Sequence, residues 1–62
     1  MAEIVMLDGV RFVTEPSTTA DSLIKNFERR SFAEVKLQNE TVYINPAHVA
    51  YVRNDPASES GD

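Results

Sequence analysis

The stretch AEVKLQNETVYINPAHVAYVR, residues 33–53, decides the fold, because apolar and polar residues alternate on both sides of a short turn. The pattern predicts a β-hairpin with a two-residue loop at Asn39 and Glu40. The opposed pairs would then be Gln38 with Thr41, Leu37 with Val42, Lys36 with Tyr43, and Val35 with Ile44. Asn-Glu lacks the glycine of the strongest hairpin turns, so a longer loop is the alternative.

The end of this stretch predicts a turn and a return strand. Pro46 ends the second arm, because proline has no N–H for the ladder and favours extended geometry in the residue before it. Residues 46–48 are expected to form a short turn. Residues 49–52, VAYV, are rich in β-forming residues and predict a last short strand.

A first hairpin is predicted from Glu3 to Thr14, with Asp8 and Gly9 as a type I′ turn. With that turn, one face carries Val5, Leu7, Val10 and Phe12, and the other carries Ile4, Met6 and Val13 around Arg11. The second face is more apolar than an ordinary solvated face. It is either core beneath the helix or an interface with another chain, and the sequence does not decide between the two.

A helix is predicted from about Thr19 to Arg30, with Thr18 as its N-cap and Asp21 completing a shortened capping box. The residues at helical spacing that form its apolar stripe are Ala20, Leu23, Ile24 and Phe27. Phe32 is expected to plug the end of the core.

These elements predict a small single α+β domain of ββαββ order, with a mostly antiparallel sheet of two hairpins and one helix packed on it. The domain is expected to span residues 1–53. Residues 54–62, NDPASESGD, are polar and acidic and are expected to form a disordered tail.

Composition restricts the function classes. The 62 residues include no cysteine, so disulfides and thiolate metal sites are excluded, and a core this small is marginal without oligomerisation. The longest apolar run, Ile4–Leu7, predicts neither a membrane span nor a signal peptide, so we expect a cytoplasmic protein. Residues 1–53 carry six basic and seven acidic groups, which disfavours a nucleic-acid binder.

No catalytic, cofactor-binding or metal-binding constellation is predicted. His48 is the only histidine, and no nucleophile motif or carboxylate pair at diagnostic spacing accompanies it. Gly9 is the only glycine before the tail, so a phosphate-binding glycine loop is not expected. We therefore expect a non-enzymatic protein that uses no cofactor.

The segment TVYINPAHVAYV, residues 41–52, resembles the end of LytTR-type DNA-binding domains and the small flagellar FlbD-type proteins. In those families a strand ending in an asparagine is followed by a turn and a return strand. The resemblance covers about a fifth of the chain. No functional residue is carried over from it.

The expected function is binding to another protein or to a second copy of the chain, through sheet edges and the apolar hairpin face. The interface candidates are Ile4, Met6, Arg11, Val13 and Tyr43. The alternative is an accessory nucleic-acid-binding protein with a small basic patch at the end of the helix. Its candidate residues are Lys25, Arg29, Arg30, Lys36 and Tyr43.

Overall fold

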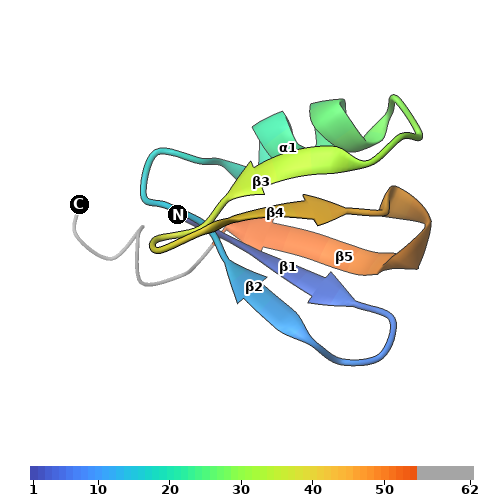
Figure 1. Ribbon diagram of the computed structural model, residues 1–62, viewed down its shortest axis with the longest axis horizontal. Helices are drawn as coiled ribbons and strands as arrows, with labels where there is room; N and C mark the ends of the chain where they lie inside the picture. The colour runs from blue at the N-terminus through green and yellow to red at the C-terminus, as the bar shows by residue number, and fades with distance from the viewer. Residues whose placement is uncertain (55–62) are drawn as a thin grey trace.

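The computed structural model describes residues 1–54, which form a small α+β domain with five strands and one α-helix (Figure 1). The elements are β1 (Ala2–Met6), β2 (Arg11–Val13), α1 (Ala20–Phe27), β3 (Ala33–Lys36), β4 (Thr41–Ile44), the 3₁₀ helix η1 (Pro46–His48) and β5 (Val49–Asn54). The predicted fold class is confirmed. Residues 55–62, and with them most of the predicted acidic tail, lie outside the described residues.

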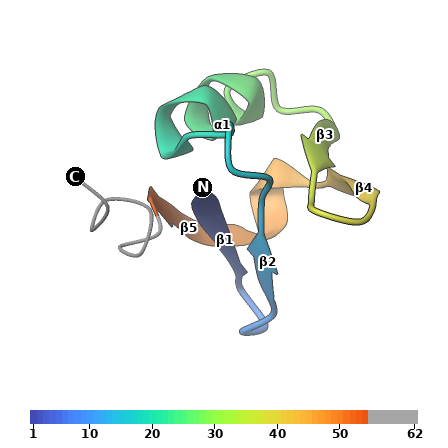
Figure 2. The same cartoon turned by 90° about the vertical axis from the view of Figure 1, so that its left-hand side faces the viewer.

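The strands form two antiparallel sheets rather than the single sheet that was expected. One sheet has the order β2-β1-β5, and the other is the hairpin β3-β4. An isolated bridge between Thr14 and Leu37 joins them, and the Glu15 N–H donates to the Lys36 carbonyl at 3.0 Å. Because η1 carries the chain across the molecule, β5 pairs with β1 and not with β4. Figure 2 shows α1 lying over the concave side of this strand arrangement.

The core lies where α1 and the hairpin β3-β4 meet the inner face of β1. Its buried residues are Ala2 and Ile4 from β1, Leu23 from α1, Val35 from β3 and Ile44 from β4. β1, α1, β3 and β4 therefore share one core, against which Phe12 of β2 and Val52 of β5 pack. Since a domain this small can bury few large side chains, each of them is expected to carry a large share of the stability.

The first hairpin has a three-residue loop, so its predicted type I′ turn is wrong. The Met6 N–H donates to the Val10 carbonyl at 2.8 Å, and the Gly9 N–H donates to the Met6 carbonyl at 3.0 Å. Gly9 has a φ of 92°, whereas Asp8 does not have the positive φ that a type I′ turn requires there. The extra loop residue moves the register by one, which pairs Ile4 with Phe12.

This shift changes which side chains share a face. Ile4 and Met6 lie on the inner face with Phe12, and Ile4 is completely buried in the core. The outer face instead carries Val5 and Arg11, together with the pair Glu3 and Val13. The predicted grouping of Ile4 and Met6 with Arg11 and Val13 on one face is therefore wrong. Of the two alternatives for that face, Ile4 follows the one in which it belongs to the core.

The strand register of the second hairpin differs from the predicted register by two residues. Each side chain therefore stays on the face that was predicted for it. Val35 pairs with Val42, and the Leu37 N–H donates to the Glu40 carbonyl at 2.8 Å, so the loop is Gln38 and Asn39. The predicted pairs are wrong: Lys36 is opposite Thr41, Tyr43 is opposite Glu34, and Ile44 is opposite Ala33. The buried face was nevertheless predicted correctly, because the side-chain period of a strand is two.

The helix begins and ends inside the predicted range. Thr19, not Thr18, is the N-cap: its Oγ1 accepts the Ser22 N–H at 3.3 Å, and Ser22 Oγ donates to the Thr19 carbonyl at 2.8 Å. Leu23 is 1% exposed, whereas Ile24 at the edge of the stripe is 48% exposed. Phe32 is 67% exposed, so it does not plug the core.

Two asparagines organise the end of the chain. Asn45 caps η1, because its Oδ1 accepts the Ala47 N–H at 3.1 Å, which confirms the predicted turn. Asn54 is the last residue of β5, and its Oδ1 accepts the Ala20 N–H at 2.9 Å at the start of α1. The strand thus extends one residue into the segment that was predicted to be a tail.

Candidate protein-binding surface

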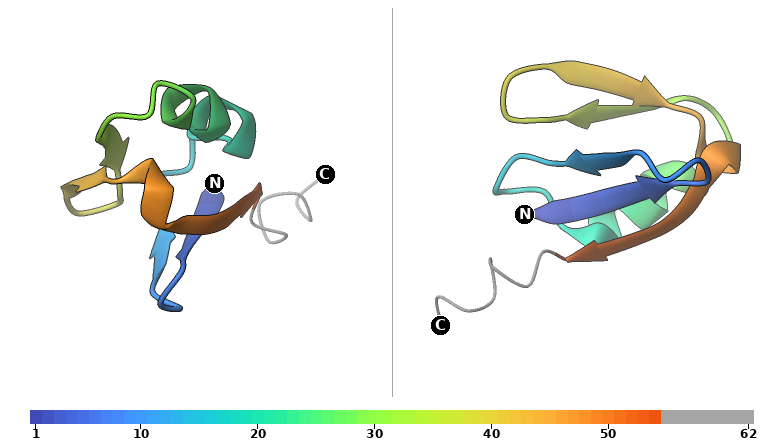
Figure 3. Two further views of the ribbon diagram at one scale, coloured as in Figure 1. Left: turned by 90° about the vertical axis from the view of Figure 1, so that its right-hand side faces the viewer. Right: turned by 90° about the horizontal axis from the view of Figure 1, so that it is seen from below.

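The outer face of the sheet β2-β1-β5 is not covered by the helix or by the second sheet (Figure 3, left). Strand pairing arranges its side chains in two rows across the three strands. One row is Val13, Glu3 and Arg53, and the next is Arg11, Val5 and Tyr51. Val13 is 41% and Tyr51 is 50% exposed. This face therefore combines apolar side chains with charged ones.

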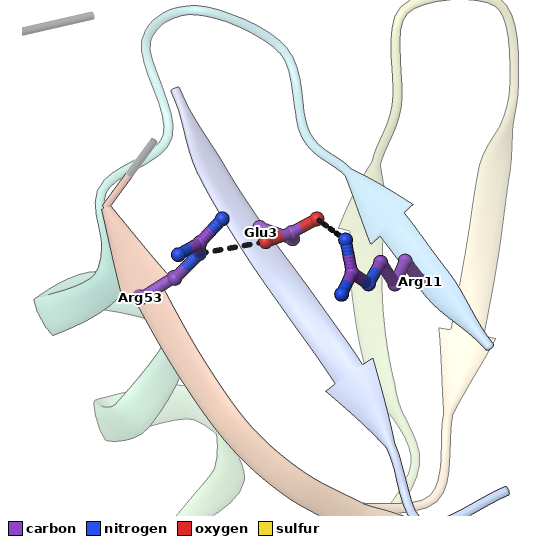
Figure 4. A network of polar contacts seen from close by, with 3 residues as sticks. All are labelled: Glu3, Arg11 and Arg53. Atoms are coloured by element: carbon purple, nitrogen blue, oxygen red, sulfur yellow. Dashed lines mark hydrogen bonds and ion pairs between the residues drawn. The ribbon is translucent and has the colours of Figure 1, made fainter. Parts of the chain in front are cut away.

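Glu3 joins the three strands of this face through ion pairs (Figure 4). Arg53 Nε of β5 donates to Glu3 Oε1 at 2.7 Å, and Arg11 Nη1 of β2 lies 3.8 Å from Glu3 Oε2. Both arginine side chains are more than half exposed, so each pair stabilises the fold by at most about 1 kcal/mol. Two guanidinium groups against one carboxylate leave this face with one net positive charge.

The tip of the first hairpin, which we define as Leu7 to Val10, is the most exposed apolar part of this sheet. Leu7 is 67% and Val10 is 47% exposed. They border a surface pocket of about 390 Å³. Its lining residues are Met6, Leu7, Asp8, Val10, Phe12 and His48. An apolar side chain of a partner would fit this pocket, because most of its lining is aliphatic or aromatic.

Hydrogen bonds hold the tip in place. The Leu7 N–H donates to the His48 carbonyl at 2.8 Å, which ties the tip to η1. The Val10 N–H donates to Asp8 Oδ1 at 3.0 Å within the loop. The exposed Leu7 side chain therefore projects from a fixed backbone, so binding would cost little ordering entropy.

The sequence did not single out this tip. A type I′ turn would have paired Leu7 with Val10 at the end of the strands, with both side chains on one face of the sheet. The signal in the sequence was an aliphatic residue on each side of Asp8-Gly9, but the three-residue loop that turns Leu7 outward depends on the register.

The structure separates the predicted interface residues. Arg11 and Val13 lie together on the outer face of β2, whereas Ile4 is buried on the opposite face. Met6 is half-buried and lines the pocket at the tip. Tyr43 is 65% exposed, but it lies on the other sheet, in β4.

The basic residues of the nucleic-acid alternative do not form one patch. Arg29 lines a depression beside Phe32, whereas Arg30 lines a different one beside Pro46. Lys25 lies in the last turn of α1, and Lys36 lies in β3. Because they lie on different sides of the helix end, these cations do not line one groove for a phosphate backbone.

Within residues 1–54, no three His, Cys, Asp or Glu side chains are grouped closely enough to hold a metal ion. His48 is exposed at the end of η1. The one α-helix of the described residues is too short to cross a membrane.

Comparisons with known proteins assign no family. No protein-family model matches the chain, and no curated protein or solved structure matches it significantly.

Proposed function

We propose that this protein is a small non-enzymatic module that binds protein, either a different partner or a second copy of itself. The observation that carries the proposal is the tip of the first hairpin, where Leu7 and Val10 are exposed beside an apolar pocket. Aliphatic side chains held in this way are suited to act as anchors in a protein interface. We include in the proposal that the module acts in the cytoplasm.

The free energy available from burying Leu7 supports a binding role for the tip. Burying a leucine side chain that is otherwise exposed contributes about 1.5–3 kcal/mol. Leu7 is 67% exposed in the isolated chain, so most of that contribution is available to a partner. Asp8 and His48 also line this pocket and supply polar groups at its border, as interfaces usually have.

Replacing Leu7 with lysine is expected to abolish this association, because a charge would have to be desolvated at the anchor position. The measurement is sedimentation velocity of the fluorescently labelled chain, alone over a range of concentrations and in cell extract. The parent is expected to associate more strongly than the Leu7→Lys variant under at least one of these conditions.

The matched control is Ile24→Lys, which removes a 48% exposed aliphatic side chain from the helix surface. It is expected to associate as the parent does. Equal association of Leu7→Lys and the parent would remove the tip from the interface. Circular dichroism verifies that both variants are folded.

The nucleic-acid alternative has less support, because its basic side chains are spread around the helix end. If it were correct, the chain would retard labelled DNA or RNA in electrophoretic mobility shifts at low salt. Replacing Lys25, Arg29 and Arg30 with glutamine would then abolish the retardation. We expect that neither the parent nor the triple glutamine variant retards DNA or RNA at moderate salt.

A further inference from the structure

The outer edge of β5 has backbone groups that point away from the sheet. In β1, the Ala2 carbonyl and the Met6 N–H bond to residues on the β2 side. Because the backbone groups of successive residues alternate in direction along a strand, those of Glu3 and Val5 point to β5. Their partners in β5 are Arg53 and Tyr51. Alternation along β5 then requires Val52 and Asn54 to direct their N–H and carbonyl groups away from β1.

This edge is the longest unpaired one in the sheet. Figure 3 (right) shows β5 along the boundary of the fold, with β1 on one side only. Among the hydrogen bonds of residues 1–54, none joins the backbone of Val52 to a segment beyond this edge. By contrast, the opposite edge strand β2 has three residues, and the chain just after it bonds to β3. An open edge of this kind is a template for another strand.

We propose that a second copy of this chain pairs with β5, antiparallel and about a two-fold axis at Val52. The two three-stranded sheets would join into one of six strands. This inference goes beyond the proposed function, because it assigns self-pairing to the edge of β5 and leaves the tip of the first hairpin to a different partner.

The side chains of β5 are complementary to themselves in this register. With Val52 opposite its own copy, Tyr51 of each chain lies opposite Arg53 of the other, on the outer face. Glu3 already holds Arg53 through Nε at 2.7 Å and balances its charge. The terminal guanidinium nitrogens are then positioned to stack on the tyrosine ring, twice by symmetry.

Neighbouring registers lack this complementarity. An axis at Arg53 would oppose two guanidinium groups, which is unfavourable. An axis at Tyr51 would leave Arg53 opposite Val49. The edge of β4 has Thr41 and Tyr43 on its outer face and no charged residue in the strand, so no such pairing selects a register there.

The test compares two substitutions at one position by sedimentation velocity. Tyr51→Lys places a lysine opposite Arg53 of the other chain at each of the two symmetric contacts. The repulsion should weaken the dimer at least about tenfold. Tyr51→Glu opposes a carboxylate to each arginine and should keep the dimer as tight as the parent or tighter. Both variants lose the same 50% exposed ring, and circular dichroism should show that both are folded.

Amide hydrogen exchange provides an independent readout. The Val52 N–H points to solvent in the monomer and to the Val52 carbonyl of the second copy in the dimer. Its exchange should therefore slow as the protein concentration rises. The Tyr51 N–H bonds to β1 in both states, so its exchange should change much less.

The outcomes separate this inference from the proposed function. A dimer that is broken by Leu7→Lys but unaffected by both Tyr51 variants would overturn pairing through β5 and leave the hairpin tip as the interface. Equal weakening by Tyr51→Lys and Tyr51→Glu would overturn the register. A parent that is monomeric at every concentration would overturn self-pairing, whereas association in extract that depends on Leu7 would keep the proposed function.

Discussion

Leu23→Ala is expected to leave the chain largely unfolded at 37 °C. Leu23 is 1% exposed and is the side chain through which α1 enters the core cluster with Ile4 and Val35. Truncating a buried leucine costs about 3–5 kcal/mol through lost burial and the cavity left behind. A domain of this size has a total stability of roughly 5 kcal/mol, so the substitution removes most of it.

The matched control for this prediction is the next residue of the same helix. Ile24→Ala removes an aliphatic side chain that is 48% exposed, and it is expected to cost less than about 1 kcal/mol. Thermal unfolding followed by circular dichroism compares the two. A cooperative transition for Leu23→Ala near that of the parent would mean that the helix does not pack through Leu23.

Thr14→Val is expected to destabilise the fold by about 1–3 kcal/mol, although valine has nearly the same shape. The Thr14 side chain is completely buried, and its Oγ1 accepts the Ala2 N–H at 3.0 Å and donates to the Glu15 carbonyl at 3.2 Å. Valine would leave the Ala2 N–H without its partner. Ala2 is also fully buried, so water cannot replace the bond.

Thr14→Ser separates the hydroxyl from the methyl group. Serine keeps the bond to the Ala2 N–H and loses one buried methyl, so it should cost about 1 kcal/mol. Chemical denaturation in urea measures both variants. If valine proves as stable as the parent, the bond between Thr14 and Ala2 does not contribute to stability.

Local pattern predicted the elements well. Alternation located the strands of both hairpins, and the spacing of Leu23 and Phe27 located the helix and its buried stripe. The break at Asn45-Pro46 located the short turn before the last strand. Each of these features depends on residues close together in the chain, so the amino-acid order alone carries the information.

The register of the first hairpin could not be predicted in this way. A two-residue type I′ turn and a three-residue loop both require positive φ at Gly9, so the same Asp8-Gly9 pair is compatible with either. They differ by one residue in register and hence in the face of β2 that is buried. Packing of Phe12 beside Ile4 accompanies the three-residue form. The exposed tip at Leu7 follows from that loop, which is why the candidate surface was missed.

The sequence by itself determined the α+β class, the order of the elements and the buried face of the second hairpin, because these follow from periodicity and local turn residues. Only the tertiary structure decided that β5 pairs with β1, that the sheet divides in two, and that the tip of the first hairpin and the edge of β5 are open. The physical reason is that strand pairing between distant segments is chosen by the packing of the whole core. Val49 and Val52 of β5 pack against the core of Ile4, Leu23, Val35 and Ile44 because η1 returns the chain to β1.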